Sequence, residues 1–201
     1  MALPPTHLAV FGLPHISRDG RELAMPVRKA LALVAFLALE GRSSRARLAE
    51  MLWSGLEADA ARRNLRHVLH RLRAADLGDV LIADDEHVAL AGVSNDLQAF
   101  EQAVAAGRLD EAHALCTGPL LDRLEVEGAP EFDDWLRSRR EQFQRAWRAA
   151  MSRHAERLEG QGDLRGAVAV HCELLDEDGL QEAAYRDLMR LHDALGERAA
   201  A

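Results

Sequence analysis

The hydrophobic positions between residues 58 and 74 repeat with the period of an α-helix and sort this stretch into two faces. At about 100° per residue, one narrow arc holds the apolar side chains Ala61, Leu65, Val68, Leu69 and Leu72. The opposite side carries the basic side chains Arg62, Arg63, Arg66, His67, His70, Arg71 and Arg73. The pattern predicts a helix with one edge in a core and a basic outer face.

The chain before this helix predicts short strands and a buried helix. Residues 6–12 alternate and end in glycine, and residues 16–23 alternate around Asp19-Gly20, a pair that supplies the positive φ of a tight turn. Residues 30–39 form a nearly unbroken apolar run that ends before Gly41, a residue typical of a helix C-terminus. We therefore expect a strand, a hairpin and a helix in the centre of the first domain.

A second helix is predicted directly before the basic one. Ser43 and Ser44 are capping residues for a helix over residues 45–53. Residues 54–57 have the Ser-x-x-Glu form of a capping box and are expected to open the basic helix. Two helices joined by a short turn, the second of them basic, predict a helix-turn-helix variant.

Residues 80–90 return to the period of strands. Residues 80–83 and 87–90 flank the acidic residues 84–86 and predict a second hairpin. A hairpin that follows a recognition helix is the wing of a winged helix. Its acidic tip opposes contact with phosphate, and His87 is the one nearby group that favours it.

From Ser94 onward the strand signals vanish. The predicted helices cover residues 96–106, 109–115, 131–159, 164–175 and 181–195. Residues 107–112 are echoed by residues 162–167, and residues 162–196 have the length of one tetratricopeptide-like helix pair. We expect stacked helical hairpins rather than an enzyme core. Residues 196–201 would start a further helix, which indicates a fragment of a longer protein.

The expected fold is mainly α with small β elements. A winged helix-turn-helix domain is predicted over residues 1–93, followed by an all-α, tetratricopeptide-like domain over residues 94–201. The net charge of −8 is unevenly distributed, because residues 1–93 carry +1 and residues 94–201 carry −9. Residues 42–73 alone carry +5, and this local field favours contact with a polyanion.

Signals of enzymatic chemistry are weak in this sequence. We find no phosphate-cradling glycine loop, metal motif or nucleophile elbow, so we expect neither an enzyme nor a cofactor. His67 and His70 are three residues apart, but the sequence places no third metal ligand beside them. Glu131, Asp133 and Asp134 complement the dipole at a helix start, which accounts for them without catalysis.

The cysteines and the apolar residues outside the basic helix predict a packed protein in the cytoplasm. Cys116 and Cys172 lie in apolar helical patterns and are expected to be buried free thiols, as in a reducing cytoplasm. No signal peptide is recognisable, and the longest apolar run is about half a membrane span, so no membrane partner is expected. We expect packing roles for Trp53, Trp135, Leu136, Phe143, Trp147 and Tyr185.

Several separated motifs resemble the SARP-type transcriptional activators, which join an OmpR-type winged helix to a bacterial transcriptional activator domain. In the first half, the motifs are residues 11–12, 29–33, 45–53, 61–66 and 69–73. In the second half, they are residues 96–100, 118–121, 131–136 and 185–190. The resemblance implies sequence-specific binding to promoter DNA in the nucleoid, activation by contact with RNA polymerase, and homodimers on direct repeats.

The residues themselves suggest roles at a DNA duplex. Arg62, Arg63, Arg66 and His70 lie on the outer arc of the basic helix and are candidates for groove contacts. The flanking candidates are Asn64, His67, Arg71 and Arg73. Arg45 and Arg47 are candidates for phosphate contacts, which position a protein without reading sequence.

Two other functions fit the same pattern. The basic helix can be a solvated surface helix, and the winged helix can then bind protein instead of DNA. The helical half is also long enough to enclose a metabolite, although its residues identify no ligand. DNA binding in a gel shift separates these possibilities.

Overall fold

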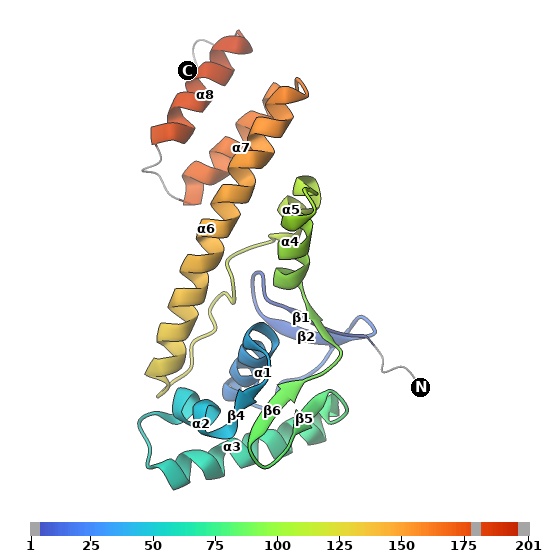
Figure 1. Ribbon diagram of the computed structural model, residues 1–201, viewed down its shortest axis with the longest axis vertical. Coiled ribbons are helices and arrows are strands. Elements are labelled where there is room, and N and C mark those ends of the chain that lie inside the picture. Colours follow the sequence, from blue (N-terminus) through green and yellow to red (C-terminus); the bar gives the residue numbers. More distant parts are fainter. Residues whose placement is uncertain (1–4, 178–181, 197–201) are drawn as a thin grey trace. The chain divides into compact units, whose positions relative to one another are not determined.

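The computed structural model describes residues 5–177 and 182–196, which form two compact units (Figure 1). The first unit combines the chain up to residue 99 with residues 115–140, and the second combines residues 100–114 with the chain from residue 141. Each unit is therefore built from two separate stretches of sequence. The domain boundary predicted between residues 93 and 94 stays a prediction.

The N-terminal strands of the first unit form a four-stranded sheet in the order β3-β2-β1-β7. The predicted strand and hairpin correspond to β1 (Thr6–Ala9), β2 (His15–Arg18) and β3 (Arg21–Glu22). β7 (Val93–Asn95) pairs in parallel with β1, so the prediction that strands end before Ser94 was wrong. Its three residues lack a local strand pattern, and only the distant β1 ladder makes them a strand.

Asp96 connects this sheet to the following helix. It is the first residue of α4 (Asp96–Ala105), and its side chain is almost fully buried. Its two carboxylate oxygens accept hydrogen bonds from the backbone N–H groups of Val10 at 2.8 Å and Phe11 at 3.1 Å. These charge-assisted bonds satisfy donors that would otherwise be unpaired in the core.

Three helices follow β3 along the chain, as the sequence predicts: α1 (Arg28–Glu40), α2 (Arg45–Trp53) and α3 (Ala58–Leu72). The Ser44 side chain caps α2 by accepting a hydrogen bond from the Arg47 backbone N–H at 3.2 Å. The predicted capping box at residues 54–57 was wrong. Ser54 lies at the C-terminal end of α2, and α3 begins only after Glu57, so Ser54 is three residues too early to cap it. Glu57 occupies the capping position and makes no side-chain cap.

The predicted second hairpin is confirmed. It consists of β5 (Leu81–Ala83) and β6 (His87–Leu90), and it is joined to α3 by a distorted turn over residues 73–77. β6 also pairs with β4 (Ser43–Ser44), the two residues that directly precede α2. The wing is therefore hydrogen-bonded to the start of the helix-turn-helix, not only to itself.

Residues 115–140 pack against α1 within the first unit. In α6 (Pro130–Gly160), the centre of the Trp135 ring lies 4.9 Å from the centre of the Phe36 ring. The Trp135 indole N–H donates a hydrogen bond to the Glu40 carboxylate at 2.9 Å. Glu40 also forms a 3.1 Å ion pair with Arg139. Residues 115–140 therefore belong to the structural support of the winged helix.

The second unit contains helical hairpins, as the glycine-punctuated pattern predicts. The predicted helix pair corresponds to α7 (Leu164–Glu177) and α8 (Glu182–Ala194), which pack together. The two similar segments, residues 107–112 and 162–167, also share a local structure. Gly107 precedes α5 (Leu109–Leu115) with φ 72°, and Gly162 precedes α7 with φ 83°. The further helix expected over residues 196–201 lies almost wholly outside the described residues.

Two predicted packing residues are not buried. Cys172 is exposed, and Tyr185 keeps 51% of its surface accessible, because each lies on the outward side of its helix. The other cysteine, Cys116, is partly buried, and burial together with the nearby charge of Asp96 raises the pKa of its thiol to about 12. Within residues 5–177 and 182–196, no helix is long and apolar enough to cross a membrane.

Replacing Asp96 with alanine tests the connection between the first sheet and α4. The change leaves two backbone donors unpaired, so we expect the free energy of unfolding to fall by about 2–4 kcal/mol. Urea denaturation followed by circular dichroism measures this loss. Glu101→Ala removes an exposed carboxylate from the same helix and should have little effect; equal losses in both variants would contradict the assignment.

Candidate nucleic-acid interface

The apolar edge of α3 is buried as the sequence predicts. Its buried residues are Ala61, Leu65, Val68, Leu69 and Leu72, each at most 5% exposed. This edge fixes the rotation of the helix about its own axis. The guanidinium-bearing positions between these residues therefore face away from the core.

A groove of about 1000 Å³ runs between α3 and the tip of the wing. In Figure 1, β5 and β6 lie beside α3 at this part of the first unit. The arginines that line the groove are Arg45, Arg62, Arg63, Arg66 and Arg73, and the carboxylates are Asp59, Asp85 and Glu86. Because the arginines outnumber the acids, the groove has a net positive charge and favours an anionic partner.

Three of these arginines are available to a ligand. Arg63, Arg66 and Arg73 are exposed, and none forms an ion pair with another residue in the described parts of the chain. Arg62 lies 3.2 Å from Asp59 in the same helix, with both side chains more than half exposed. Since such exposed pairs are worth little, Asp59 does not remove Arg62 from the interface.

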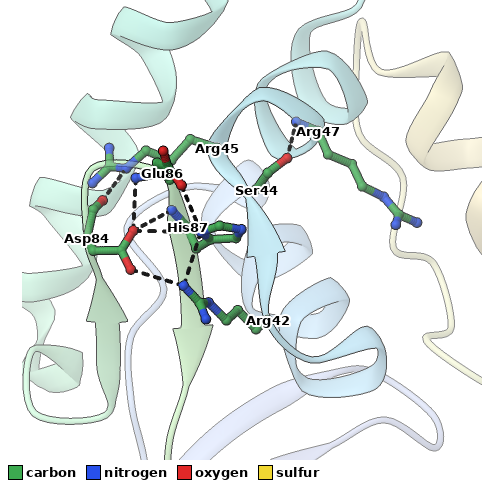
Figure 2. Close-up of polar contacts among 7 residues, drawn as sticks. All are labelled: Arg42, Ser44, Arg45, Arg47, Asp84, Glu86 and His87. Atoms are coloured by element: carbon green, nitrogen blue, oxygen red, sulfur yellow. Dashed lines mark hydrogen bonds and ion pairs between the residues drawn. The ribbon is translucent and has the colours of Figure 1, made fainter.

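Arg45 has a structural role in the groove that the sequence did not reveal. Its backbone N–H donates to the carbonyl of Glu86 at 2.8 Å, and its Nε donates to the carbonyl of Asp84 at 2.7 Å (Figure 2). Both acceptors belong to the wing tip. Arg45 thus holds the wing against the start of α2, and its charge stays in the groove because carbonyl groups do not neutralise it.

The acidic wing tip is an ordered turn. Asp84 Oδ1 accepts hydrogen bonds from the backbone N–H groups of Glu86 at 2.9 Å and His87 at 2.6 Å. Its other oxygen lies 3.3 Å from the Arg42 guanidinium, which also donates to the His87 ring at 3.1 Å (Figure 2). The backbone hydrogen bonds from His87 and Glu86 lower the pKa of the Asp84 carboxyl. Asp84 therefore serves the turn, and Asp85 and Glu86 are the wing acids that line the groove.

The other predicted site residues lie outside this groove. Arg47 extends away from the wing, and its guanidinium carbon is 5.4 Å from the centre of the Phe36 ring (Figure 2). His70 is exposed on α3 but does not line the groove. His67 and Arg71 line a second, smaller pocket, and Arg71 donates to the Pro26 carbonyl at 2.9 Å. The structure thus brings five of the nine predicted residues together.

Comparison with known proteins gives a family and a fold. Residues 85–201 match the family described as bacterial transcriptional activator domain. The structure of Mycobacterium tuberculosis EmbR in complex with a low-affinity phosphopeptide superimposes with a TM-score of 0.74 over 98% of this chain, at 19% sequence identity. This chain spans 57% of the EmbR chain. No curated protein matches the sequence. The likeness confirms the predicted fold class, which is mainly helical with a small β component.

The titration of Asp84 tests the role of its carboxylate at the wing tip. Hydrogen bonds to the charged form hold its folded pKa below the ordinary value of 3.8. The stabilisation of the turn by these hydrogen bonds is therefore complete when the pH is above the ordinary pKa of 3.8. It is lost as the pH falls through the lower pKa of Asp84 in the folded protein. We expect the carboxyl carbon of Asp84 to titrate below 3.8 in an NMR experiment.

An alanine pair supplies the control for this measurement. In Asp84→Ala, the amide protons of Glu86 and His87 should exchange faster with solvent, because they lose their acceptor. Asp85→Ala removes a neighbouring acid that makes neither bond and should leave both exchange rates unchanged. Slow exchange in Asp84→Ala would show that the turn does not depend on this carboxylate.

Proposed function

This chain belongs to the family of proteins with a bacterial transcriptional activator domain, and from that membership we propose that it is a sequence-specific DNA-binding activator of transcription. The family is one of transcriptional regulators and not of enzymes. The observation that carries the proposal is the arginine-lined groove between α3 and the wing. The major groove of DNA accepts one α-helix, and α3 presents its cations together on its outer side.

The position of each arginine along α3 suggests a division of roles. A recognition helix contacts base edges with its N-terminal part, where Arg62 and Arg63 lie, and Arg66 follows one turn later on the same outer side. Arginine forms paired hydrogen bonds with guanine, so these three are the proposed sequence-reading residues. Arg73 follows the end of α3 and Arg45 begins α2, and both are proposed to contact phosphate.

The remaining predicted residues receive lesser roles in this proposal. His70 is exposed next to the reading residues and can extend the contact along α3. Arg47 and Arg71 lie outside the groove and contribute positive field at its margins, and His67 lies outside the groove as well. The wing acids Asp85 and Glu86 repel phosphate, so most of the binding free energy is expected to come from α3 and not from the wing.

The proposed partners beyond DNA are those that the family resemblance implies. The helical-repeat domain would contact RNA polymerase or a regulatory protein, since stacked helical hairpins offer extended binding surfaces. Homodimers would bind direct repeats of the operator, and the protein would act on the nucleoid in the cytoplasm. The phosphopeptide in the EmbR structure is a ligand of that protein.

Two arginine substitutions test the division into reading and positioning residues. For Arg66→Ala we expect a loss of about 1–3 kcal/mol on the preferred duplex and a weaker preference at one base pair. For Arg73→Ala we expect weaker binding to every duplex and a salt slope that falls by about one unit. Duplexes selected from fragmented genomic DNA and random duplexes are titrated by fluorescence anisotropy between about 50 and 200 mM salt.

A matched variant makes this experiment decisive. Arg153→Ala removes an exposed arginine from α6, outside the groove, and should bind both kinds of duplex as the unmodified protein does. Failure of the unmodified chain to bind any duplex at low salt would contradict the proposed function. Binding that Arg66→Ala and Arg73→Ala leave unchanged would refute the placement of the interface.

A further inference from the structure

A second pocket, of about 510 Å³, lies in the first unit on a different side of α3 from the arginine-lined groove. Its apolar lining comes from Val27, which is half-buried, and from the small accessible parts of Trp53, Val68 and Val126, which are each at most 7% exposed. The volume is within the range of small-molecule sites, which combine apolar walls with a few polar groups. None of the residues proposed to contact DNA directly lines this pocket.

Three cations surround the apolar wall, and backbone carbonyl groups hold each of them. Lys29 Nζ donates to the Leu52 carbonyl at 2.7 Å, and Arg71 donates to the Pro26 carbonyl at 2.9 Å. Arg28 donates to two carbonyl groups of the segment after residue 122, each at 3.3 Å. A carbonyl fixes the position of a cation but does not cancel its charge. The pocket therefore has positioned positive charges.

Few carboxylates oppose these charges. Among the described residues, Arg28, Lys29 and Arg71 form no ion pair within 4.0 Å. Glu127 is the single acid in the pocket wall, and its charge acts on Lys29 without a direct contact. The wall thus has an excess of positive charge beside apolar surface, which suits a ligand with the opposite charge and an apolar body.

Lys29 lies where the two kinds of surface meet. Its ammonium group is 5.0 Å from the centre of the Trp53 ring and is partly buried. Burial lowers the pKa of Lys29, which means that the charged form lacks part of its solvation. An anion beside the ammonium group would compensate for the missing water. Trp53 is only 7% exposed, so an apolar group would meet chiefly the half-buried Val27 and the accessible part of Trp53.

We propose that this pocket binds a small amphipathic carboxylate. Its carboxylate would lie between Lys29 and Arg71, and its apolar body would pack on Val27 and on the accessible part of Trp53. Both the charge and the apolar body are needed, because the cations are exposed enough to be screened by salt when they act alone. The inference concerns small-molecule binding and does not depend on the proposed contact with DNA.

Three probes separate the contributions of charge and apolar surface. The full chain is titrated with 1-naphthoate, with its uncharged amide, 1-naphthamide, and with inorganic phosphate, and amide chemical shifts are followed by NMR. We expect 1-naphthoate to bind about tenfold or more tightly than either other probe. Its shifts should concentrate at residues 27–29, 64–71 and 126–127 and at Trp53. Equal affinity for 1-naphthamide, or shifts concentrated elsewhere, would overturn the proposal.

Two substitutions with opposite expected effects on 1-naphthoate affinity distinguish a loss of pocket charge from a loss of folded protein. Lys29→Met should weaken 1-naphthoate binding about tenfold, and Glu127→Gln should strengthen it severalfold, because it removes the opposing acid. A gain of affinity cannot come from a damaged fold. Arg66→Ala lies on the arginine-lined groove and should leave the affinity unchanged. Unchanged affinity in Glu127→Gln would also overturn the proposal.

Discussion

The burial of one edge of α3 is the interaction on which the candidate interface depends. Leu65, Leu69 and Leu72 are each at most 2% exposed, and burial of a leucine side chain is worth about 2 kcal/mol. Rotation of α3 about its axis would expose this edge and bury guanidinium groups, so a single rotation is strongly favoured. Because Arg63 and Arg66 lie on the other side, their outward direction follows from packing and not from contacts of their own.

The second constraint is the position of the wing. β4 joins the wing ladder directly before α2, and Arg45 extends that attachment by bonding to two wing carbonyl groups. Asp84 orders the tip from within. The groove therefore has two fixed walls: one is set by apolar packing of α3, and the other by backbone hydrogen bonds of the wing. A preorganised groove loses less conformational entropy when it binds a partner.

The features predicted correctly from the sequence are those that depend on interactions between residues close together in the chain. The apolar edge of α3, the Asp19-Gly20 turn and the Ser44 cap each depend on residues within about one helical turn of one another. Pairing between distant segments was missed. β7 exists through its ladder with β1, Asp84 has a partner in Arg42, and Arg71 reaches a carbonyl 45 positions away. Helical period also could not tell which face of α7 or α8 stays exposed, so Cys172 and Tyr185 were placed wrongly.

Amide hydrogen exchange of the chain, with and without its selected duplex, tests the central claim most directly, because it reports where DNA lies. We expect slower exchange in the complex at residues 59–73 and 84–87 and unchanged exchange at residues 27–29 and 126–127. Protection confined to the helical hairpins after residue 141, or a uniform pattern with and without the duplex, would contradict an interface formed by α3 and the wing.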